Sequence, residues 1–149
     1  MQITATDTVN APIDRVFEVF SDVANCGDRI SGITELEVLS DVQSGLGVKW
    51  RETRVMFGKE ATEEMWMSGY DAPNSYQVEA ESHGTHYLTT FTFKAIDDNT
   101  TEVSWIFEGK AISLMAKLMM PLGALFKGAT RKMMAADITD LKNYVEAQG

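Results

Sequence analysis

Hydrophobic and polar residues alternate at the start of the chain and then change to a helical spacing. Residues 3–9 alternate as a half-buried strand does, because successive side chains of a strand point to opposite faces. Asn10-Ala11-Pro12 predicts a helix start, since asparagine is a good N-cap and proline is favoured in the first turn. The apolar face of residues 16–20 indicates one short helix, and Ser21 or Asp22 begins a second.

Between residues 33 and 109 the pattern has the period of strands. Alternating segments are separated by short turns rich in Gly, Pro, Asn and Asp. Because short turns join antiparallel neighbours, the segments predict consecutive antiparallel strands. We place these strands at residues 33–39, 48–57, 61–70, 75–82, 85–96 and 100–109.

Helical spacing returns after Lys110 and continues almost to the end. Residues 113–120 predict one helical segment, and Pro121 either begins a new helix or kinks this one. From Phe126 onward, apolar residues at helical spacing predict a long amphipathic helix. Its apolar face consists of Thr130, Met133, Met134, Ile138, Leu141, Tyr144 and Val145.

The predicted order is one strand, two short helices, six strands and one long helix. Helices that lie on one face of an antiparallel sheet define an α+β architecture. The long helix must bury its apolar face, and the sheet is the large partner available. We therefore predict a curved antiparallel sheet of about seven strands against a C-terminal helix, in a single domain of residues 1–149.

Composition and charge narrow the class of protein. The chain has 149 residues and a net charge of −9, which disfavours nucleic acid as a partner because phosphate binding needs clustered Lys and Arg. Its single cysteine, Cys26, permits no internal disulfide and no multi-thiolate zinc site. The N-terminus does not have the pattern of a secretory signal, and no uncharged apolar run reaches the roughly 18 residues of a membrane span. We expect a cytoplasmic protein without a metal or a cofactor.

The charge is distributed unevenly along the chain. Residues 1–109 hold 19 acidic and 7 basic residues, whereas residues 110–149 hold 3 acidic and 6 basic ones. Residues 110–136 contain five basic residues and no acidic one. Residues 110–132 could therefore form a lip that transiently contacts an anionic membrane surface. The alternative, a core helix whose lysines face water, is favoured.

Short motifs occur in a defined order along essentially the whole chain. They are Asn10-Ala11-Pro12-x-x-x-Val16-Phe17, Ser21-Asp22-Val23, Gly45-x-Gly47-x-x-Trp50, Pro73-x-x-Tyr76, Thr100-Thr101-Glu102-Val103-x-Trp105 and Asp140-Leu141-Lys142-Asn143-Tyr144-Val145-Glu146. In this order they resemble the START-like (SRPBCC) helix-grip superfamily, which includes START lipid-transfer domains, the birch-pollen allergen family and the polyketide cyclase/dehydrase-like proteins.

The resemblance implies a deep apolar cavity between the sheet and the long helix. Relatives use this cavity for lipids, quinones, sterols or aromatic metabolites, and a minority catalyse reactions there. Many members carry an aromatic residue near the end of the second short helix, where this chain has Cys26-Gly27-Asp28-Arg29-Ile30-Ser31. Because that segment commonly borders the cavity, the resemblance does not identify the ligand.

Aromatic residues and methionines gather on one set of strand faces. The pattern alone favours a packed core, and the resemblance favours a ligand cavity. The predicted lining is Trp50, Arg54, Met65, Tyr76, Tyr87, Phe91, Trp105, Phe107, Leu122, Phe126, Met133 and Asp137. The opposite register of strands 48–57 and 61–70 would replace Trp50 and Arg54 by Arg51 and Val55.

Charged residues on two predicted elements are candidates for chemistry. Glu52 and Arg54 share a face with Trp50, and an inward guanidinium would bind a ligand carboxylate or carbonyl. An ion pair on the exposed sheet face is the favoured alternative. Asp137 lies on the apolar face of the last helix. It could be a catalytic carboxylate with a raised pKa. The favoured alternative is that it is the structural partner of an inward arginine.

Two histidines flank Gly84-Thr85. If those two residues form the hairpin loop, His83 and His86 are directly opposed and close enough to share a metal ion, although surface positions are favoured. The sequence contains no complete catalytic constellation. Arg54 and Asp137 are the main catalytic candidates, and Glu52 and Tyr87 are the others.

These observations predict binding or transport of a hydrophobic small molecule in the cavity, without catalysis. The alternatives are a polyketide cyclase/dehydratase-like enzyme that uses the same cavity, or a module that interacts with a protein partner not identified by the sequence. A fully packed interior would favour the interaction module.

Overall fold

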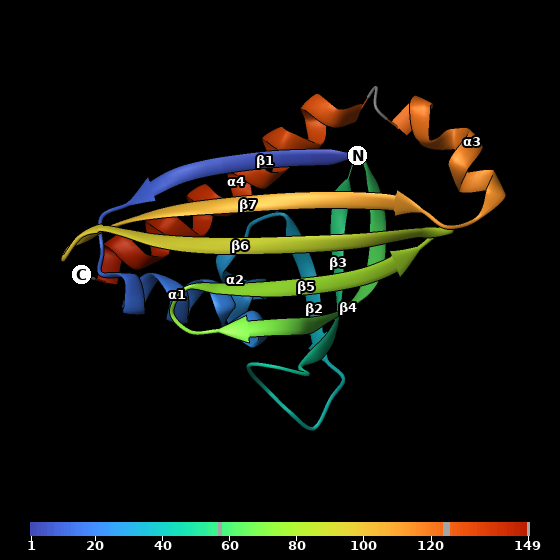
Figure 1. The fold of residues 1–149 in the computed structure, drawn as a ribbon. Coiled ribbons are helices and arrows are strands. Elements are labelled where there is room, and N and C mark those ends of the chain that lie inside the picture. The colour runs from blue at the N-terminus through green and yellow to red at the C-terminus, as the bar shows by residue number, and fades with distance from the viewer. Residues whose placement is uncertain (57, 124–125, 149) are drawn as a thin grey trace.

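The computed structural model describes residues 1–56, 58–123 and 126–148 (Figure 1). The strands are β1 (Gln2–Val9), β2 (Ile33–Val38), β3 (Lys49–Met56), β4 (Lys59–Asp71), β5 (Ser75–Ser82), β6 (Thr85–Asp97) and β7 (Thr100–Ala111). The helices are α1 (Ile13–Ser21), the 3₁₀ turn η1 (Val23–Asn25), α2 (Cys26–Arg29), α3 (Leu114–Gly123) and α4 (Lys127–Gln148).

In the described part of the chain, seven strands form one antiparallel sheet in the order β1-β7-β6-β5-β4-β3-β2. Strands β2 to β7 follow one another as a meander, and β1 returns to pair with β7, so β1 and β2 are the two edges. Figure 1 shows β3 and β4 running nearly crosswise to β6 and β7, because the sheet twists and curves. This arrangement with a long C-terminal helix confirms the predicted α+β helix-grip fold.

A β-bulge in β4 contributes to this curvature. The pairing of β4 with β5 shifts between Met67 and Gly69, which leaves Ser68 as an extra residue that bends the strand. A Cβ at Gly69 would lie 2.8 Å from Gln77 Oε1 and 3.1 Å from Gln77 Cβ, so a larger residue would force the Gln77 side chain to shift. The bend turns the half of the sheet formed by β2, β3 and β4 around the C-terminal helix α4.

Aromatic side chains close one end of the space beneath the sheet. Phe17 and Phe20 of α1 meet Phe93 of β6 edge-on, with ring centroids 5.2 and 5.7 Å apart. Pro12 is the N-cap residue of α1 and forms no side-chain cap hydrogen bond. The predicted cap by Asn10 is wrong, because Asn10 lies two residues before the N-cap position. The backbone N–H of Asn10 donates to Glu146 Oε2 at 2.8 Å.

Helix α4 lies against the sheet and is tied along its C-terminal half. Ser31 donates both its N–H and its hydroxyl to Asp140 Oδ2 at 2.9 Å. The Arg29 guanidinium lies over the Tyr144 ring, 4.1 Å from its centroid. The side chains that α4 buries are Met134, Asp137, Ile138, Leu141 and Val145.

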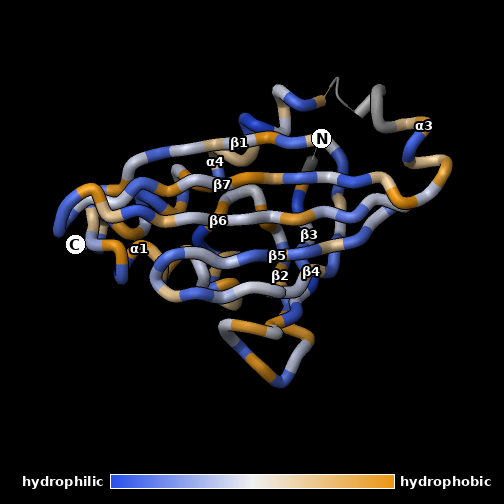
Figure 2. The backbone as a smooth tube through the Cα atoms, in the orientation of Figure 1, coloured by the Kyte–Doolittle hydropathy of each residue, from blue (hydrophilic) through white to orange (hydrophobic). Residues whose placement is uncertain are grey.

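Helix α3 departs from the end of β7 and lies beyond the sheet (Figure 1). Its start is held by Ser113, whose Oγ accepts the Ala116 N–H at 3.1 Å, while the Ile112 N–H donates to the Gly84 carbonyl at 2.8 Å. Leu114 and Leu118 are 76% and 67% exposed, and Figure 2 shows hydrophobic residues along this helix. The favoured prediction of a core helix within residues 110–132 is therefore wrong for residues 114–119, of which only Ala116 is buried. The helix also continues through Pro121, so no new helix begins there.

No helix among the described residues is long and apolar enough to cross a bilayer.

Candidate functional site

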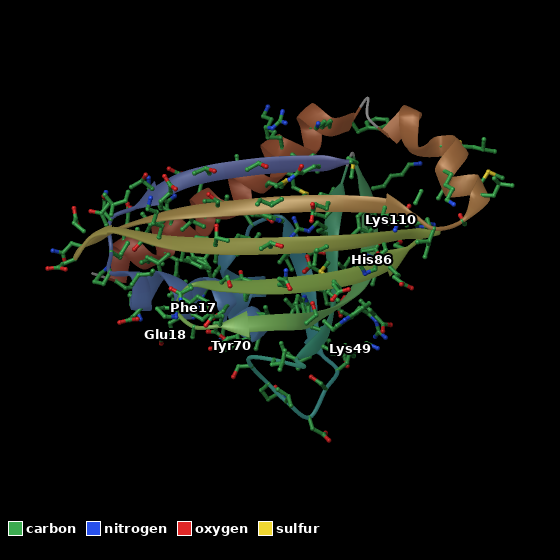
Figure 3. The ribbon with its side chains drawn as sticks, in the orientation of Figure 1. Phe17, Glu18, Lys49, Tyr70, His86 and Lys110 are labelled. Carbon is green, nitrogen blue, oxygen red and sulfur yellow. The ribbon has the colours of Figure 1, made fainter. Side chains whose placement is uncertain are left out.

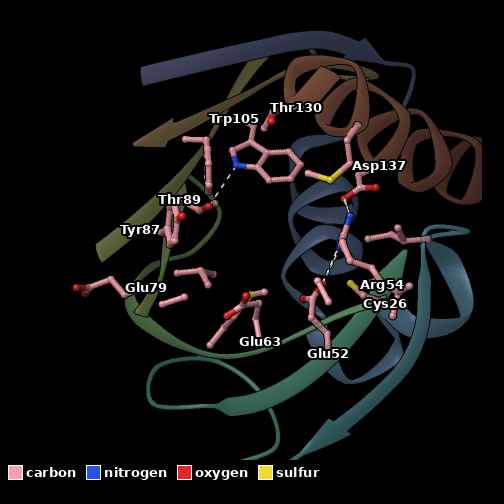
Figure 4. A pocket seen from close by; sticks show the side chains of 18 of the residues that line it. Cys26, Glu52, Arg54, Glu63, Glu79, Tyr87, Thr89, Trp105, Thr130 and Asp137 are labelled. Atoms are coloured by element: carbon pink, nitrogen blue, oxygen red, sulfur yellow. Dashed lines mark hydrogen bonds and ion pairs between the residues drawn. The ribbon is translucent and has the colours of Figure 1, made fainter. Parts of the chain in front are cut away.

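A cavity of about 660 Å³ lies between the inner face of the sheet and α4 (Figure 4). Its wall is built by strands β2 to β7 together with side chains of α1, α2, α3 and α4. Of the predicted lining residues, the structure places these on the wall: Trp50, Arg54, Met65, Tyr76, Tyr87, Phe91, Trp105, Phe107, Phe126, Met133 and Asp137. The side chain of Leu122 lies outside the described part of the structure.

Stacked aromatic rings form the sheet side of the wall. Phe91 and Trp105 pair across β6 and β7 with centroids 4.9 Å apart, and Tyr87 stacks on Phe107 at 5.4 Å. Tyr76 stacks on Phe91 at 5.0 Å. These residues reach the same face because side chains alternate along each strand and the strands are in register.

The polar atoms of two of these rings are already bonded within the protein. The Tyr76 hydroxyl donates to the Phe20 carbonyl at 3.0 Å, and burial raises its pKa well above the ordinary value. Trp105 Nε1 donates to Thr89 Oγ1 at 3.3 Å (Figure 4). The wall therefore presents mainly ring faces to a ligand.

A charged cluster lies on the wall where β3 faces α4. The Arg54 guanidinium donates to Glu52 Oε2 through Nε at 3.1 Å and Nη2 at 2.9 Å, and to Asp137 Oδ2 through Nη1 at 3.0 Å. Trp50 Nε1 donates to the other Glu52 oxygen at 3.1 Å. The cluster thus joins the middle of β3 to the middle of α4 (Figure 4).

The register of β3 places this cluster inside. Glu52 is 6% exposed and Trp50 3%, whereas Val55 is 53% exposed on the outer face. The favoured prediction of an ion pair on the exposed sheet face is therefore wrong. The alternative register, with Arg51 and Val55 inward, does not occur, since Arg51 pairs with Glu37 and Glu64 outside.

Burial raises the pKa of Asp137. Desolvation is the largest cause of this increase, and the negative charges of Glu52 and Asp140 raise the pKa further. The nearby Arg54 lowers the pKa, and the resulting value is about 6. For Arg54, burial alone would lower the pKa, but the two carboxylates raise it above its ordinary value. The guanidinium therefore stays charged, and the Asp137 carboxyl holds its proton to a higher pH than an ordinary aspartate does.

A third carboxyl group shares this inner face. Glu63 of β4 pairs with Glu52 across the two strands, and its Oε1 accepts the Ser82 hydroxyl at 3.0 Å. Figure 4 shows Glu63 beside Glu52, whereas Glu79 points away. The Glu79 carboxylate is bonded on the outer face to His86 Nε2 at 2.8 Å.

Cys26 also lines the cavity but is not activated. Its thiol donates to the Asp22 carbonyl at 3.3 Å. Burial, with the nearby Asp22, raises the thiol pKa to about 12. The thiol therefore stays protonated at neutral pH and does not act as a nucleophile.

The two histidines do not form a pair. His83 and Gly84 are the loop residues, both with positive φ (51° and 74°), which matches a two-residue hairpin turn. His86 consequently faces Glu81 across the ladder and lies outside, beside Lys110 (Figure 3). The condition for an opposed pair, a loop at Gly84-Thr85, is therefore not met, and the predicted strand ends at residues 82 and 85 are confirmed. The described residues contain no group of three or more side chains placed to hold a metal ion.

Sequence reasoning missed part of the wall. Met115 and Met119 of α3 line the cavity, as do Cys26 and Ile30 near α2. The alternative interpretation of residues 110–132 as a lip placed this segment at the cavity, but the favoured interpretation placed it in the core. The position of Glu63 opposite Glu52 required the β3–β4 register.

Solved structures share this fold over nearly the whole chain. The Zhui aromatase/cyclase from Streptomyces sp. R1128 aligns with a TM-score of 0.77 and 18% identity, over 98% of this chain and 93% of that one. A START superfamily protein from Mycobacterium smegmatis aligns with a TM-score of 0.78 and 12% identity, over 99% of both chains. Norcoclaurine synthase from Thalictrum flavum, in complex with dopamine and hydroxybenzaldehyde, aligns with a TM-score of 0.74 and 17% identity, over 100% of this chain and 88% of that one.

At these identities the structural likeness shows the fold alone. A comparison with curated proteins finds no match. Residues 1–146 match the family described as "Polyketide cyclase / dehydrase and lipid transport". The chain therefore belongs to the polyketide cyclase/dehydrase and lipid transport family.

Proposed function

We propose that this protein binds and carries a hydrophobic small molecule, a lipid, a quinone or an aromatic metabolite, in the cavity between the sheet and α4. The observation that carries the proposal is the cavity itself, about 660 Å³ and walled mainly by aromatic and apolar side chains. This volume lies within the roughly 300–1,000 Å³ of small-molecule sites. The family description, which includes lipid transport, supports the same conclusion.

Apolar burial supplies the affinity and the charged cluster supplies the orientation. A ligand that buries roughly 300 Å² of apolar surface gains about 7 kcal/mol from leaving water. The stacked faces of Tyr87, Phe107 and Trp105 favour a flat or aromatic ligand. The polar end of the ligand lies toward Glu52, Arg54 and Asp137.

Native mass spectrometry of freshly purified protein, followed by organic extraction, tests this function. We expect a discrete added mass that extraction resolves to a lipid, a quinone or an aromatic compound. A clean apo mass that does not change after incubation with a mixed lipid extract would contradict the proposal.

The second candidate is a cyclase/dehydratase-like enzyme. The observation that favours it is the Asp137 carboxyl, on the cavity wall with a pKa of about 6, beside a charged guanidinium. A group with this pKa can both accept and donate a proton at neutral pH, as general acid–base catalysis requires. Two solved structures with this fold are described as an aromatase/cyclase and a synthase.

The Asp137→Asn variant distinguishes a carrier from an enzyme. A carrier retains its ligand with a modest change in affinity. An enzyme retains the ligand but loses turnover of the extracted compound or its precursor by at least ~100-fold. The measurement combines native mass spectrometry with chromatography of the ligand before and after incubation.

Helix α3 is the proposed contact with an anionic membrane surface. Its exposed Leu114 and Leu118 lie in the segment 110–136, which holds five basic residues and no acidic one. Met115 and Met119 of the same helix line the cavity, so a ligand could pass from the lipid surface into the protein at this position.

The third candidate, an interaction module, loses its expected support because the interior is not fully packed. The cytoplasmic location stays a prediction.

A further inference from the structure

The charged side chains that face the cavity are mostly acidic. Among the described lining residues, Glu52, Glu63 and Asp137 point inward, and Arg54 is the basic side chain that faces them (Figure 4). His83 lies exposed at the rim. The wall therefore presents more acidic than basic side chains to a ligand.

Arg54 is occupied by the protein's own carboxylates. Each of its three guanidinium nitrogens donates to Glu52 or Asp137, at 2.9 to 3.1 Å. These bonds use three of the five N–H donors, so a ligand carboxylate is left only the second N–H of each Nη atom, beside two carboxylates that already pair with the guanidinium. Arg54 is therefore a weaker anchor for a ligand carboxylate than an unpaired guanidinium would be.

Hydrogen-bond acceptors, in contrast, remain open toward the cavity. Within the described structure, Asp137 accepts its hydrogen bond at Oδ2 and Glu63 accepts its bond at Oε1, so Asp137 Oδ1 and Glu63 Oε2 have no donor. Asp137 as a whole is only 5% exposed and lines the cavity, so a ligand there can reach this carboxylate. The hydroxyls of Thr89 and Tyr87 can donate or accept and do not discriminate.

We infer that the cavity selects a hydrophobic ligand whose polar end donates hydrogen bonds, an amine or a hydroxyl group, and rejects a ligand that ends in a carboxylate. The inference rests on the proposed function, because it names the class of ligand for the same cavity. An ammonium group gains the attraction of the unpaired carboxylate oxygens, and a neutral hydroxyl satisfies them without a charge. A carboxylate meets like charges at short range in a medium of low dielectric constant.

A matched series of three ligands tests the inference. The probes are 2-(1-naphthyl)ethylamine, 2-(1-naphthyl)ethanol and 1-naphthylacetic acid, which share one ring system and carry positive, no and negative charge at pH 7.5. Isothermal titration calorimetry measures their affinities for the full chain. We expect the amine and the alcohol to bind, and the acid to bind at least ~10-fold more weakly than the alcohol.

A charge-matched pair of variants locates the selectivity inside the cavity. Glu63→Gln removes an inward carboxylate, and Glu64→Gln removes the neighbouring outward one, which is paired with Arg51 at 3.1 Å. We expect Glu63→Gln to reduce the ratio of the alcohol's affinity to the acid's affinity several-fold, and Glu64→Gln to leave this ratio unchanged. Circular dichroism verifies that both variants fold.

The outcomes separate the two claims. If the acid binds as tightly as the amine and the alcohol, the inference is overturned while the proposed function stands. Equal effects of the two glutamate variants overturn the role of the inward carboxylates. If none of the three probes binds and native mass spectrometry finds no ligand, the proposed function fails, and the inference fails with it.

Discussion

Arg54 lies between two buried carboxylates that come from distant parts of the chain. Its side chain is 13% exposed, and those of Glu52 and Asp137 are 8% and 7% exposed. Burying charges costs free energy that only good geometry offsets, and here the guanidinium fork supplies the hydrogen bonds. At the scale of single residues, this cluster both links β3 to α4 and sets the polarity of the cavity wall.

Replacing Arg54 by methionine should destabilise the protein strongly. The Arg54→Met variant leaves two buried carboxylates without a counter-charge, so we expect the free energy of unfolding to fall by about 3–5 kcal/mol. Arg51→Met is the matched control, because that side chain is 43% exposed on the outer face, and it should cost about 0–1 kcal/mol. Urea denaturation measures both.

A second substitution identifies the cause of the loss. Adding Asp137→Asn to Arg54→Met leaves one buried carboxylate fewer, so the double variant should regain part of the lost stability. Equal stability of Arg54→Met and Arg51→Met would show that the cluster does not contribute as described.

The pKa of Asp137 makes stability depend on pH in a defined direction. Burial raises this pKa from 3.8 to about 6, so the folded protein binds the proton more tightly than the unfolded chain does. The resulting contribution is fully present below about pH 4 and is lost as the pH rises through about 6. It amounts to about 2–3 kcal/mol.

The difference between the wild type and Asp137→Asn isolates this effect from other titrating groups. Urea unfolding at pH 4, 5, 6 and 7 should show the wild type losing stability relative to the variant across this range. Asp98→Asn, in the turn between β6 and β7, is the control and should parallel the wild type. Parallel curves for Asp137→Asn would contradict the assignment.

The two C-terminal helices differ in how they are attached. The C-terminal half of α4 is tied by Ser31 to Asp140, by Arg54 to Asp137 and by the Arg29–Tyr144 contact. In α3, Ala116 is buried, and every other described side chain is exposed. At the scale of elements, α4 is structural, whereas α3 presents apolar surface that the fold does not use.

Exposed leucines of α3 should control association with anionic vesicles. We expect the protein to co-sediment with vesicles of mixed phosphatidylcholine and phosphatidylglycerol and less with phosphatidylcholine alone. Leu114→Ser/Leu118→Ser should weaken the association at least ~10-fold, since each buried leucine is worth about 1.5–3 kcal/mol. Stability should not change, because these residues are 76% and 67% exposed.

The matched control for this surface is Ile96→Ser, at an exposed apolar residue in β6. It should bind vesicles as the wild type does. Equal binding to neutral and anionic vesicles, or an equal loss in Ile96→Ser, would exclude α3 as the contact.

At the scale of the whole molecule, the dominant feature is an unfilled space. A cavity of about 660 Å³ is large for a chain of this length, since protein interiors are normally packed with few voids. The sheet curves away from α4 and the aromatic core under α1 closes one end, so the side chains do not meet in the middle. Binding of a ligand there should raise the melting temperature by mass action.

Filling the cavity should block the ligand and leave the fold intact. Ala80 lines the cavity on β5 opposite Met65 and Tyr87, and we expect Ala80→Trp to weaken binding of the extracted ligand at least ~10-fold without lowering the melting temperature. Ala95→Trp makes the same change at an exposed position of β6 and should leave binding unaffected. Calorimetry and thermal unfolding measure the two effects. Unchanged binding in Ala80→Trp would place the ligand elsewhere.

The period of hydrophobic residues was sufficient to predict the order of elements, the antiparallel sheet and the long last helix. This works because strand and helix periods are local properties of the chain. The face of β3 that lies inside depended on its register with β2 and β4, which the alternation of Trp50, Glu52 and Arg54 leaves open. Whether the two histidines oppose each other depended on register in the same way: with His83 in the loop, His86 faces Glu81 instead.

By itself, then, the sequence determined the α+β fold, the acidic character of the chain and the residues able to face the helix. Only the tertiary structure decided that Arg54 meets Asp137, 83 residues away, that Glu63 joins them and that α3 stays outside the core. The physical reason is that a cavity and its charges arise from packing between distant elements. Local spacing controls which side chains share a face, whereas the curvature and register of the sheet control what that face meets.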